Sequence, residues 1–310
     1  MPMKKKVIIG TRGSKLALYQ AKRAQSELQQ HFPELEVELE IIHTKGDKVL
    51  DVALSKIGDN GLFTKEIEQA LLEGRIDLAV HSMKDLPTVF PENLKLGAVL
   101  ERGEARDALI STGKRKLSAL TPEDVIATSS VRRRAQLLKI NPHFNIVDIR
   151  GNVDTRLKKW RSGYCTAMIM ASAGLQRLGL DDAISEIVAV EQMIPAPAQG
   201  IIAIESREND AFIDELLQKI NHRDSWIKGR AEYAFLEALE GGCQVPIGCI
   251  SEVHGDEFSI QGVVLSPNGQ KSITGNLQST TGNAIATAKK LAASFIEKGA
   301  HQIIGDIERF

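Results

Sequence analysis

Residues 7–18, VIIGTRGSKLAL, decide the fold class of this 310-residue chain. Val7–Thr11 is a short apolar run with β-branched residues that predicts a strand. Ser14 follows at once and is a residue type that caps helices. A helix through about Gln30 should follow, because small and apolar residues recur at helical spacing: Leu18, Ala21, Ala24 and Leu28. A strand that leads directly into a helix is the basic unit of an α/β fold.

The same alternation continues along the chain. We expect strands at Val37–His43 and Ile76–His81 with a helix at Phe63–Glu73 between them. A second run gives strands at Val125–Thr128, Ile146–Ile149 and Thr166–Ala171, with helices at Val131–Ile140 and Val153–Arg161. Because Ile126–Ser130 is similar to residues 9–14, the sequence predicts two related α/β domains, each with a parallel sheet.

Three other segments depart from this alternation. Thr44–Gly61 is a loop of a length typical of a lid or a disordered segment. Pro195–Pro197 is interpreted as a hinge or linker before a strand at Ile201–Ser206. After Arg223 we expect a small α+β domain: a helix through about Leu239, several short strands between Gly248 and Leu277, and a helix at Asn283–Lys298.

The composition is that of a soluble globular protein, with 43% hydrophobic and 25% charged residues. A net charge of −1 and 5% aromatic residues argue against a general nucleic-acid binder. No apolar run is long enough to span a membrane, and the N-terminus lacks the apolar core of a signal peptide. Three widely spaced cysteines form neither a disulfide framework nor a zinc motif. We therefore expect a cytoplasmic protein.

The arginines are distributed unevenly, since ten of the 17 lie between Arg102 and Arg177. Several follow the ends of predicted strands, where ligands bind in open α/β sheets. The turn Thr128–Ser130 also opens a helix, whose free N–H groups attract anions. These features indicate a cleft for several carboxylates or phosphates, although each arginine alone could equally form a surface ion pair.

Two residues of the turn after Ile76–His81 could carry chemistry. Asp85 stands beside Lys84, and opposite charge favours an ionised carboxylate, which is suited to stabilising a cation. It could equally be a turn former that bonds its own backbone. His81 is a candidate base or ligand, but a buried core histidine explains it as well.

The three cysteines differ in their surroundings. Cys165 and Cys249 fall in predicted strands and are interpreted as small buried hydrophobic residues. Cys243 lies in the glycine-opened loop Glu240–Pro246, where the backbone can approach a ligand closely. A loop thiol is a nucleophile if its pKa is lowered, and otherwise it is inert.

Five motifs occur along the chain: GTRGSKLAL at Gly10–Leu18, HSMKDLP at His81–Pro87, ATSSVRRRAQ at Ala127–Gln136, RGNVDTRL at Arg150–Leu157 and EGGCQVPIG at Glu240–Gly248. In kind and order they resemble the porphobilinogen deaminase (hydroxymethylbilane synthase) family. The resemblance implies two periplasmic-binding-protein-like α/β domains plus a small C-terminal α+β domain. The first would comprise residues 1–100 with 201–219, the second 101–200, and the third, carrying the cofactor cysteine, 220–310.

The resemblance also implies an activity. Members of the family deaminate four porphobilinogen molecules and join them head to tail, releasing hydroxymethylbilane and ammonia in tetrapyrrole (haem) biosynthesis. The product grows on a dipyrromethane primer held as a thioether, and Cys243 matches the attachment cysteine. Loss of ammonia leaves an azafulvenium cation, and Asp85 matches the catalytic aspartate that stabilises it. The family implies no metal, no nucleic acid and no membrane, and a monomeric enzyme.

The other matched positions would hold the acetate and propionate groups of the pyrrole rings. For the cofactor they are Lys84, Thr128, Ser129, Ser130, Arg132, Arg133, Arg150 and Arg156. Asp85 is also matched to the cofactor, through the N–H groups of its pyrrole rings. For the substrate they are Arg12, Ser14, Gln20, Arg150, Arg156, Arg177 and Gln199.

Three positions depart from the family pattern. Asn60 stands where many relatives have a lysine, Tyr233 where arginine is common, and Pro195–Gly200 reads PAPAQG in place of PAVGQG. The alternative function is a two-domain anion-binding protein without catalysis, which would leave Cys243 and Asp85 without roles.

Overall fold

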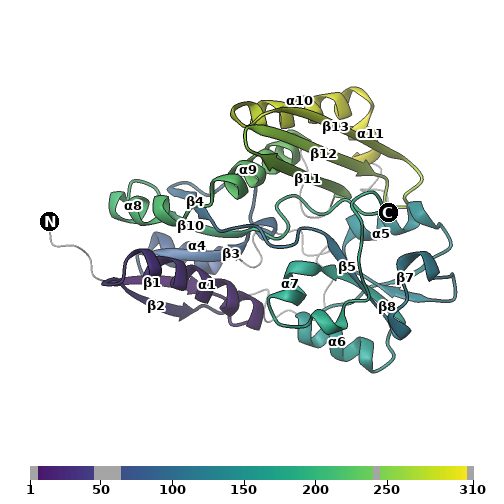
Figure 1. Cartoon of the computed structure of the whole chain (residues 1–310), viewed down its shortest axis with the longest axis horizontal. Coiled ribbons are helices and arrows are strands. Elements are labelled where there is room, and N and C mark those ends of the chain that lie inside the picture. The colour runs from purple at the N-terminus through teal and green to yellow at the C-terminus, as the bar shows by residue number, and fades with distance from the viewer. Residues whose placement is uncertain (1–5, 45–63, 240–244, 306–310) are drawn as a thin grey trace. The chain divides into compact units, whose positions relative to one another are not determined.

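The computed structural model describes residues 6–44, 64–239 and 245–305 (Figure 1). The chain divides into two compact units, Met1–Arg102 with Ile201–Trp226 and Gly103–Gly200 with Ile227–Phe310. The predicted loop Thr44–Gly61, apart from Thr44, and the residue Cys243 lie outside the described residues. In the described parts of the chain, no helix is both long and apolar enough to cross a membrane.

The first unit contains a five-stranded sheet in the order β2-β1-β3-β10-β4. Strands β1, β2 and β3 are parallel, whereas β10 runs antiparallel between β3 and β4. The strands are β1 Lys6–Thr11, β2 Glu36–Ile41, β3 Leu78–Ser82, β4 Leu94–Val99 and β10 Ile202–Arg207. The helices are α1 Lys15–His31, α4 Lys65–Leu72 and α8 Ala211–Ile220. The chain thus leaves this sheet after β4 and returns to its interior at β10.

Alternation along β3 divides the core of this unit between the two faces of the sheet. Leu78 and Val80 pack with residues of α1 and α8. Ala79 packs with Ile67 and Leu71 of α4 on the other face. Since successive side chains of a strand point to opposite faces, His81 lies on the α4 face with Ala79.

The second unit repeats this arrangement in the order β7-β6-β8-β5-β9. Strands β6, β7 and β8 are parallel, and β5 runs antiparallel between β8 and β9. The strands are β5 Asp107–Ser111, β6 Val125–Ala127, β7 Asn145–Val147, β8 Ala167–Ala171 and β9 Glu186–Ile187. The helices are α5 Val131–Ile140, α6 Val153–Arg161 and α7 Ser172–Gln176. Strand order and direction match the first sheet, as expected for two related α/β domains.

The second unit also contains an antiparallel sheet of three strands near the C-terminus (Figure 1). Its strands are β11 Ile247–His254, β12 Glu257–Leu265 and β13 Ser272–Thr280, and its helices are α9 Arg223–Ala238, α10 Ala284–Glu297 and α11 Ala300–Gly305. Phe235 and Phe295 form an edge-to-face pair with ring centroids 5.5 Å apart in its core. A Cβ atom at Gly262 would stand 2.5 Å from the Phe235 ring, so this close packing requires glycine there.

The predicted fold class, two α/β domains plus a small C-terminal α+β domain, is confirmed. Two expectations are wrong. The strands of the C-terminal sheet are eight or nine residues long, not short. Neither five-stranded sheet is wholly parallel, because β10 in the first and β5 in the second run antiparallel to their neighbours. A hinge or linker at Pro195–Pro197 stays a prediction; Pro195 and Pro197 are buried, and the Pro195 carbonyl accepts a hydrogen bond from the N–H of Cys249. The exact boundaries of three domains stay a prediction.

Candidate functional site

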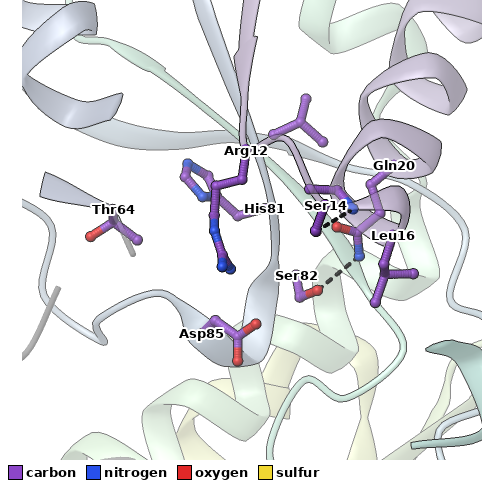
Figure 2. A pocket seen from close by; sticks show the side chains of 10 residues that line it. Arg12, Ser14, Leu16, Gln20, Thr64, His81, Ser82 and Asp85 are labelled. Atoms are coloured by element: carbon purple, nitrogen blue, oxygen red, sulfur yellow. Dashed lines mark hydrogen bonds between the residues drawn. The ribbon is translucent and has the colours of Figure 1, made fainter. Parts of the chain in front are cut away.

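A pocket in the first unit lies where β1 and β3 end (Figure 2). In this picture, the Arg12 side chain extends from the end of β1 toward Asp85, while Ser14 and Gln20 approach from the α1 side. Its lining consists of Arg12, Ser14, Leu16, Ala17, Gln20, Thr64, Val80, His81, Ser82 and Asp85. Four of the sequence-predicted residues (Arg12, Ser14, Gln20 and Asp85) therefore come together here.

Local hydrogen bonds fix the α1 side of the pocket. Ser14 is the N-cap of α1, and its Oγ accepts a hydrogen bond from the N–H of Ala17 at 3.3 Å. Gln20 Nε2 donates to Ser82 Oγ at 2.8 Å, which ties the helix to the end of β3. Ser14 and Gln20, which are predicted to contact the substrate, thus also stabilise the shape of the pocket.

Asp85 is presented by a single 3₁₀ turn, Met83–Asp85. Met83 is fully buried, and its N–H donates to the Ile201 carbonyl at 3.0 Å. The N–H of Leu86 closes the turn on the Met83 carbonyl at 3.0 Å. This anchored turn leaves the Asp85 side chain exposed and Lys84 half-buried. A carboxylate in a pocket with the cation Arg12 can stabilise positive charge on a ligand.

In the second unit, hydroxyl groups organise the turn before α5. Ser130 is the N-cap of the helix and accepts from the N–H of Arg133 at 3.4 Å, and the N–H of Ser130 donates to Thr128 Oγ1 at 3.2 Å. Ser129 Oγ donates to the Ile149 carbonyl at 2.8 Å and accepts from the Ile149 N–H. These hydroxyls therefore hold the helix N-terminus, where backbone N–H groups attract anions.

Arg132 and Arg133 are buried around Asp107, the first residue of β5. Arg132 Nη2 lies 2.8 Å from Asp107 Oδ2, and Arg133 Nη2 lies 2.7 Å from Oδ1. Burial opposes ionisation of Asp107, but the two guanidinium groups and a hydrogen bond from Gln199 outweigh it and hold its pKa below the usual value. Two buried cations facing one carboxylate leave this cluster positively charged.

Gln199 belongs to the same cluster. It is fully buried, and its Nε2 donates to the Ala105 carbonyl at 2.7 Å and to Asp107 Oδ1 at 2.9 Å. Arg132, Arg133 and Gln199 are thus internal side chains in this structure, and their contacts with cofactor or substrate stay predictions. Sequence reasoning missed Asp107; its only signal is a lone acid that opens the apolar run Ala108–Ile110.

The remaining predicted arginines are half-buried. Arg156 Nε donates to the Gly151 carbonyl at 2.8 Å, and Arg177 Nη2 donates to the Gly200 carbonyl at 2.6 Å. The Arg150 guanidinium has no ion pair or hydrogen bond with any residue that the structure describes. Among the predicted ligand-binding arginines, Arg150 is therefore the one whose guanidinium is most readily available to bind a carboxylate.

Two family models match the chain. One, described as "Porphobilinogen deaminase, dipyromethane cofactor binding domain", matches residues 7–215, and one described as "Porphobilinogen deaminase, C-terminal domain" matches residues 226–297. The chain belongs to the porphobilinogen deaminase family. The resemblance carried by the five motifs is thereby confirmed.

Relatives in this family match over nearly the full length. The chain is similar to porphobilinogen deaminase of Syntrophomonas wolfei, with 46% identity over 296 residues that cover 96% of this chain and 97% of that protein. It is 45% identical to the porphobilinogen deaminase of Carboxydothermus hydrogenoformans, with 99% of each protein covered. Among solved structures, the effector-binding domain of BenM with benzoate is similar at 19% identity with a TM-score of 0.44, covering 70% of this chain and 91% of that one.

The matched family domain makes dipyrromethane the cofactor of this porphobilinogen deaminase family member. The donors present in the second unit fit such a group, whose rings carry several carboxylates. They combine the N-terminus of α5 with the half-buried cations Arg150 and Arg156. Cys243, the predicted attachment residue, lies outside the described residues.

A departure from the family pattern has a structural cost. Ala198 replaces the glycine of PAVGQG, and it is buried with φ 59°, in the left-handed region that disfavours side chains. Its N–H donates to Glu232 Oε2 at 2.6 Å, which holds the backbone in that conformation.

We expect Ala198→Gly to raise the free energy of unfolding by about 1 kcal/mol, because glycine relieves this strain. Ala196→Gly, two residues away, is the control; it should lower stability by about 0.5–1 kcal/mol through unfolded-state entropy. Urea unfolding of both variants measures the two changes. A less stable Ala198→Gly variant would mean that the position is not strained.

Proposed function

We propose that this chain is a hydroxymethylbilane synthase: a transferase that deaminates four porphobilinogen molecules and joins them head to tail on a dipyrromethane primer attached to Cys243. Hydroxymethylbilane and ammonia would be released for tetrapyrrole synthesis. We further propose that it acts as a cytoplasmic monomer, without a metal, a nucleic acid or a membrane. Family membership and the pocket that contains Asp85 and Arg12 support this proposal.

The observation that carries the proposal is the placement of Asp85 in that pocket. Cleavage of the substrate's C–N bond releases ammonia and leaves a positive charge on the pyrrole. A carboxylate held by the anchored turn Met83–Asp85 stabilises this charge as it forms, without having to reorganise. Arg12 and Ser14 would bind the substrate's carboxylates, so that its methylene carbon lies near Asp85.

The primer would supply the nucleophilic carbon of its terminal pyrrole ring. Its carboxylates would be held by Thr128, Ser129, Ser130, Arg150 and Arg156, and by Lys84, Arg132 and Arg133. Arg177 and Gln199 would contact the substrate or the growing chain. Holding both partners removes much of the entropic barrier to each addition.

Conversion of porphobilinogen by the purified protein tests the proposal. Uroporphyrin should appear after acid and oxidation, and the denatured protein should itself give a colour with Ehrlich's reagent, because a dipyrromethane remains attached. The proposal is wrong if the protein binds porphobilinogen but gives no colour and forms no product. That result would indicate the alternative function, a non-catalytic anion-binding protein.

Two arginines should separate substrate binding from primer binding. Arg12→Gln should retain the primer but raise KM by about 10- to 100-fold, since a charge-assisted hydrogen bond contributes about 1.5–3 kcal/mol. Arg150→Gln should yield protein with less primer, measured as Ehrlich colour per mole. Equal primer content and unchanged KM in both variants would remove these residues from the site.

A further inference from the structure

A buried acid–histidine pair lies on the α4 face of the first sheet. His81 Nε2 is 3.3 Å from Glu205 Oε2, and the two side chains are 5% and 0% exposed. In the β3–β10 register, His81 stands opposite Ala203 and Glu205 opposite Ala79. The pair is therefore formed by diagonal neighbours on one face of the two central strands.

The surroundings of Glu205 offer it no other partner. Among the residues that the structure describes, neither carboxylate oxygen has a hydrogen-bond donor. A buried carboxylate is costly unless it is paired, so His81 is the group that compensates its charge. Such a pair is weak evidence for a stabilising role.

Glu68 of α4 is the second acid near this pair. Burial raises the pKa of Glu68 and the charge of Glu205 raises it further, while Thr64, His81 and Lys65 act in the opposite direction. Glu68 therefore holds its proton to higher pH than an ordinary glutamate does.

His81 lines the same pocket as Asp85, which relates the pair to the chemistry. The inference rests on the proposed function. Each addition forms a C–C bond at the free α-carbon of the terminal pyrrole, and the hydrogen on that carbon must leave as a proton. Asp85 is engaged with the cation, so another group has to accept the proton. We propose that His81 is this base and that Glu205 is a positioning residue behind it.

The proton balance follows from the pair. His81 Nε2 lies 3.3 Å from Glu205 Oε2 without forming a hydrogen bond in this structure. In the proposed resting state the neutral imidazole carries its proton on Nε2, the nitrogen that faces Glu205, and the Nδ1 lone pair is then the acceptor. When the α-carbon loses its proton to Nδ1, the C–H electrons return to the pyrrole ring and restore its aromaticity. The imidazolium then faces a carboxylate, so the pair becomes neutral overall. Transfer of that proton to the ammonia released in the same addition forms ammonium and restores neutral His81.

The proposal predicts an acidic limb in the pH dependence of kcat, because protonated His81 cannot accept a proton. The charged and titratable groups around His81 are Glu205 from β10, Glu68 and Lys65 from α4, and Arg12 and Asp85 in the pocket. Glu205→Gln removes the carboxylate that faces the imidazolium, so the position of this acidic limb should change in that variant.

The test uses primer-loaded His81→Gln, Glu205→Gln and the control Glu68→Gln, with porphobilinogen deuterated at its free α-carbon as the probe. His81→Gln should lower kcat by about 10²-fold or more, the usual contribution of a general base. It should show a primary deuterium isotope effect larger than that of the wild type, since C–H cleavage becomes slow. Glu205→Gln should lower kcat less and shift the acidic limb, and Glu68→Gln should match the wild type.

Several results would overturn the assignment. One is a His81→Gln protein with wild-type kcat and the same acidic limb in its pH profile. Another is a His81→Gln protein with lowered kcat but no increased deuterium isotope effect, because that result indicates a structural role for His81. If His81→Gln fails to fold, the isosteric variant Glu205→Gln tests the assignment alone: an acidic limb of kcat at the wild-type position would overturn it. Wild-type protein that does not consume porphobilinogen contradicts the proposed function itself, so the two failures are distinguishable.

Discussion

Asp85→Asn should lower kcat by about 10²- to 10³-fold while the protein folds and retains primer, because one preorganised charge at the reacting centre is lost. Asn keeps the size and a hydrogen-bonding oxygen of the side chain. Asp85 is exposed on an anchored turn, so its replacement should leave the core of the first unit intact. Steady-state rates normalised to primer content measure the effect.

Asp85→Glu is the matched control. It keeps the charge but moves it by one methylene, and such a misplacement can cost about 10² in rate. It should therefore retain more activity than Asp85→Asn. If Asp85 only formed the turn, Asn would be the milder change, since Asn substitutes well in turns. An Asn variant as active as the wild type would end the catalytic assignment.

Asp107→Asn should lower the free energy of unfolding by about 3–5 kcal/mol, because Arg132 and Arg133 would remain buried without their carboxylate. Asp148→Asn is the control: Asp148 pairs with Arg134 at 3.2 Å but is 64% exposed, and such pairs contribute about 0–1 kcal/mol. Urea unfolding followed by circular dichroism compares the variants. Equal midpoints for Asp107→Asn and wild type would show that the buried cluster contributes nothing to stability.

The difference in free energy of unfolding between wild type and Asp107→Asn should depend on pH, because the pKa of Asp107 is lowered in the folded protein. A carboxyl group whose folded pKa is depressed contributes stability above its unfolded pKa and loses it as pH falls toward the folded one. The gap between wild type and Asp107→Asn should therefore be full at neutral pH and narrow below about pH 4, near the unfolded value. A gap that widens in acid would contradict the pairing.

Local sequence patterns predict much of the fold. The predicted helices Val131–Ile140 and Val153–Arg161 have the bounds of α5 and α6, because caps and helical spacing are properties of neighbouring residues. Ser14 and Ser130 were recognisable as helix starts for the same reason. The sequence analysis does not predict strands β4 and β5 or helix α8. Strand β5 is buried along its whole length, so it gives no alternation. Strand β4 does alternate at its start, and α8 has an N-cap at Asp210 and helical spacing, so both had a recognisable signal.

The candidate site is less accessible to sequence reasoning because its contacts are remote along the chain. Asp107 meets Arg133, 26 residues away, and this pairing buries two arginines that local sequence places at an exposed helix start. Glu205 meets His81 only because β10 inserts beside β3 from a distant part of the chain. Family resemblance supplied the roles of Asp85 and Cys243, whereas no sequence pattern indicated either pairing.

We expect the protein to build its product on a primer attached to Cys243. The other two thiols are poor candidates, since Cys249 is fully buried and burial raises the pKa of Cys165 to about 11. Intact-protein mass spectrometry of wild type and Cys243→Ser is the most direct measurement. The wild type should carry one dipyrromethane and gain porphobilinogen-derived units stepwise when substrate is added, and Cys243→Ser should carry neither. An adduct that persists on Cys243→Ser, or that maps to Cys165 or Cys249, would contradict the account.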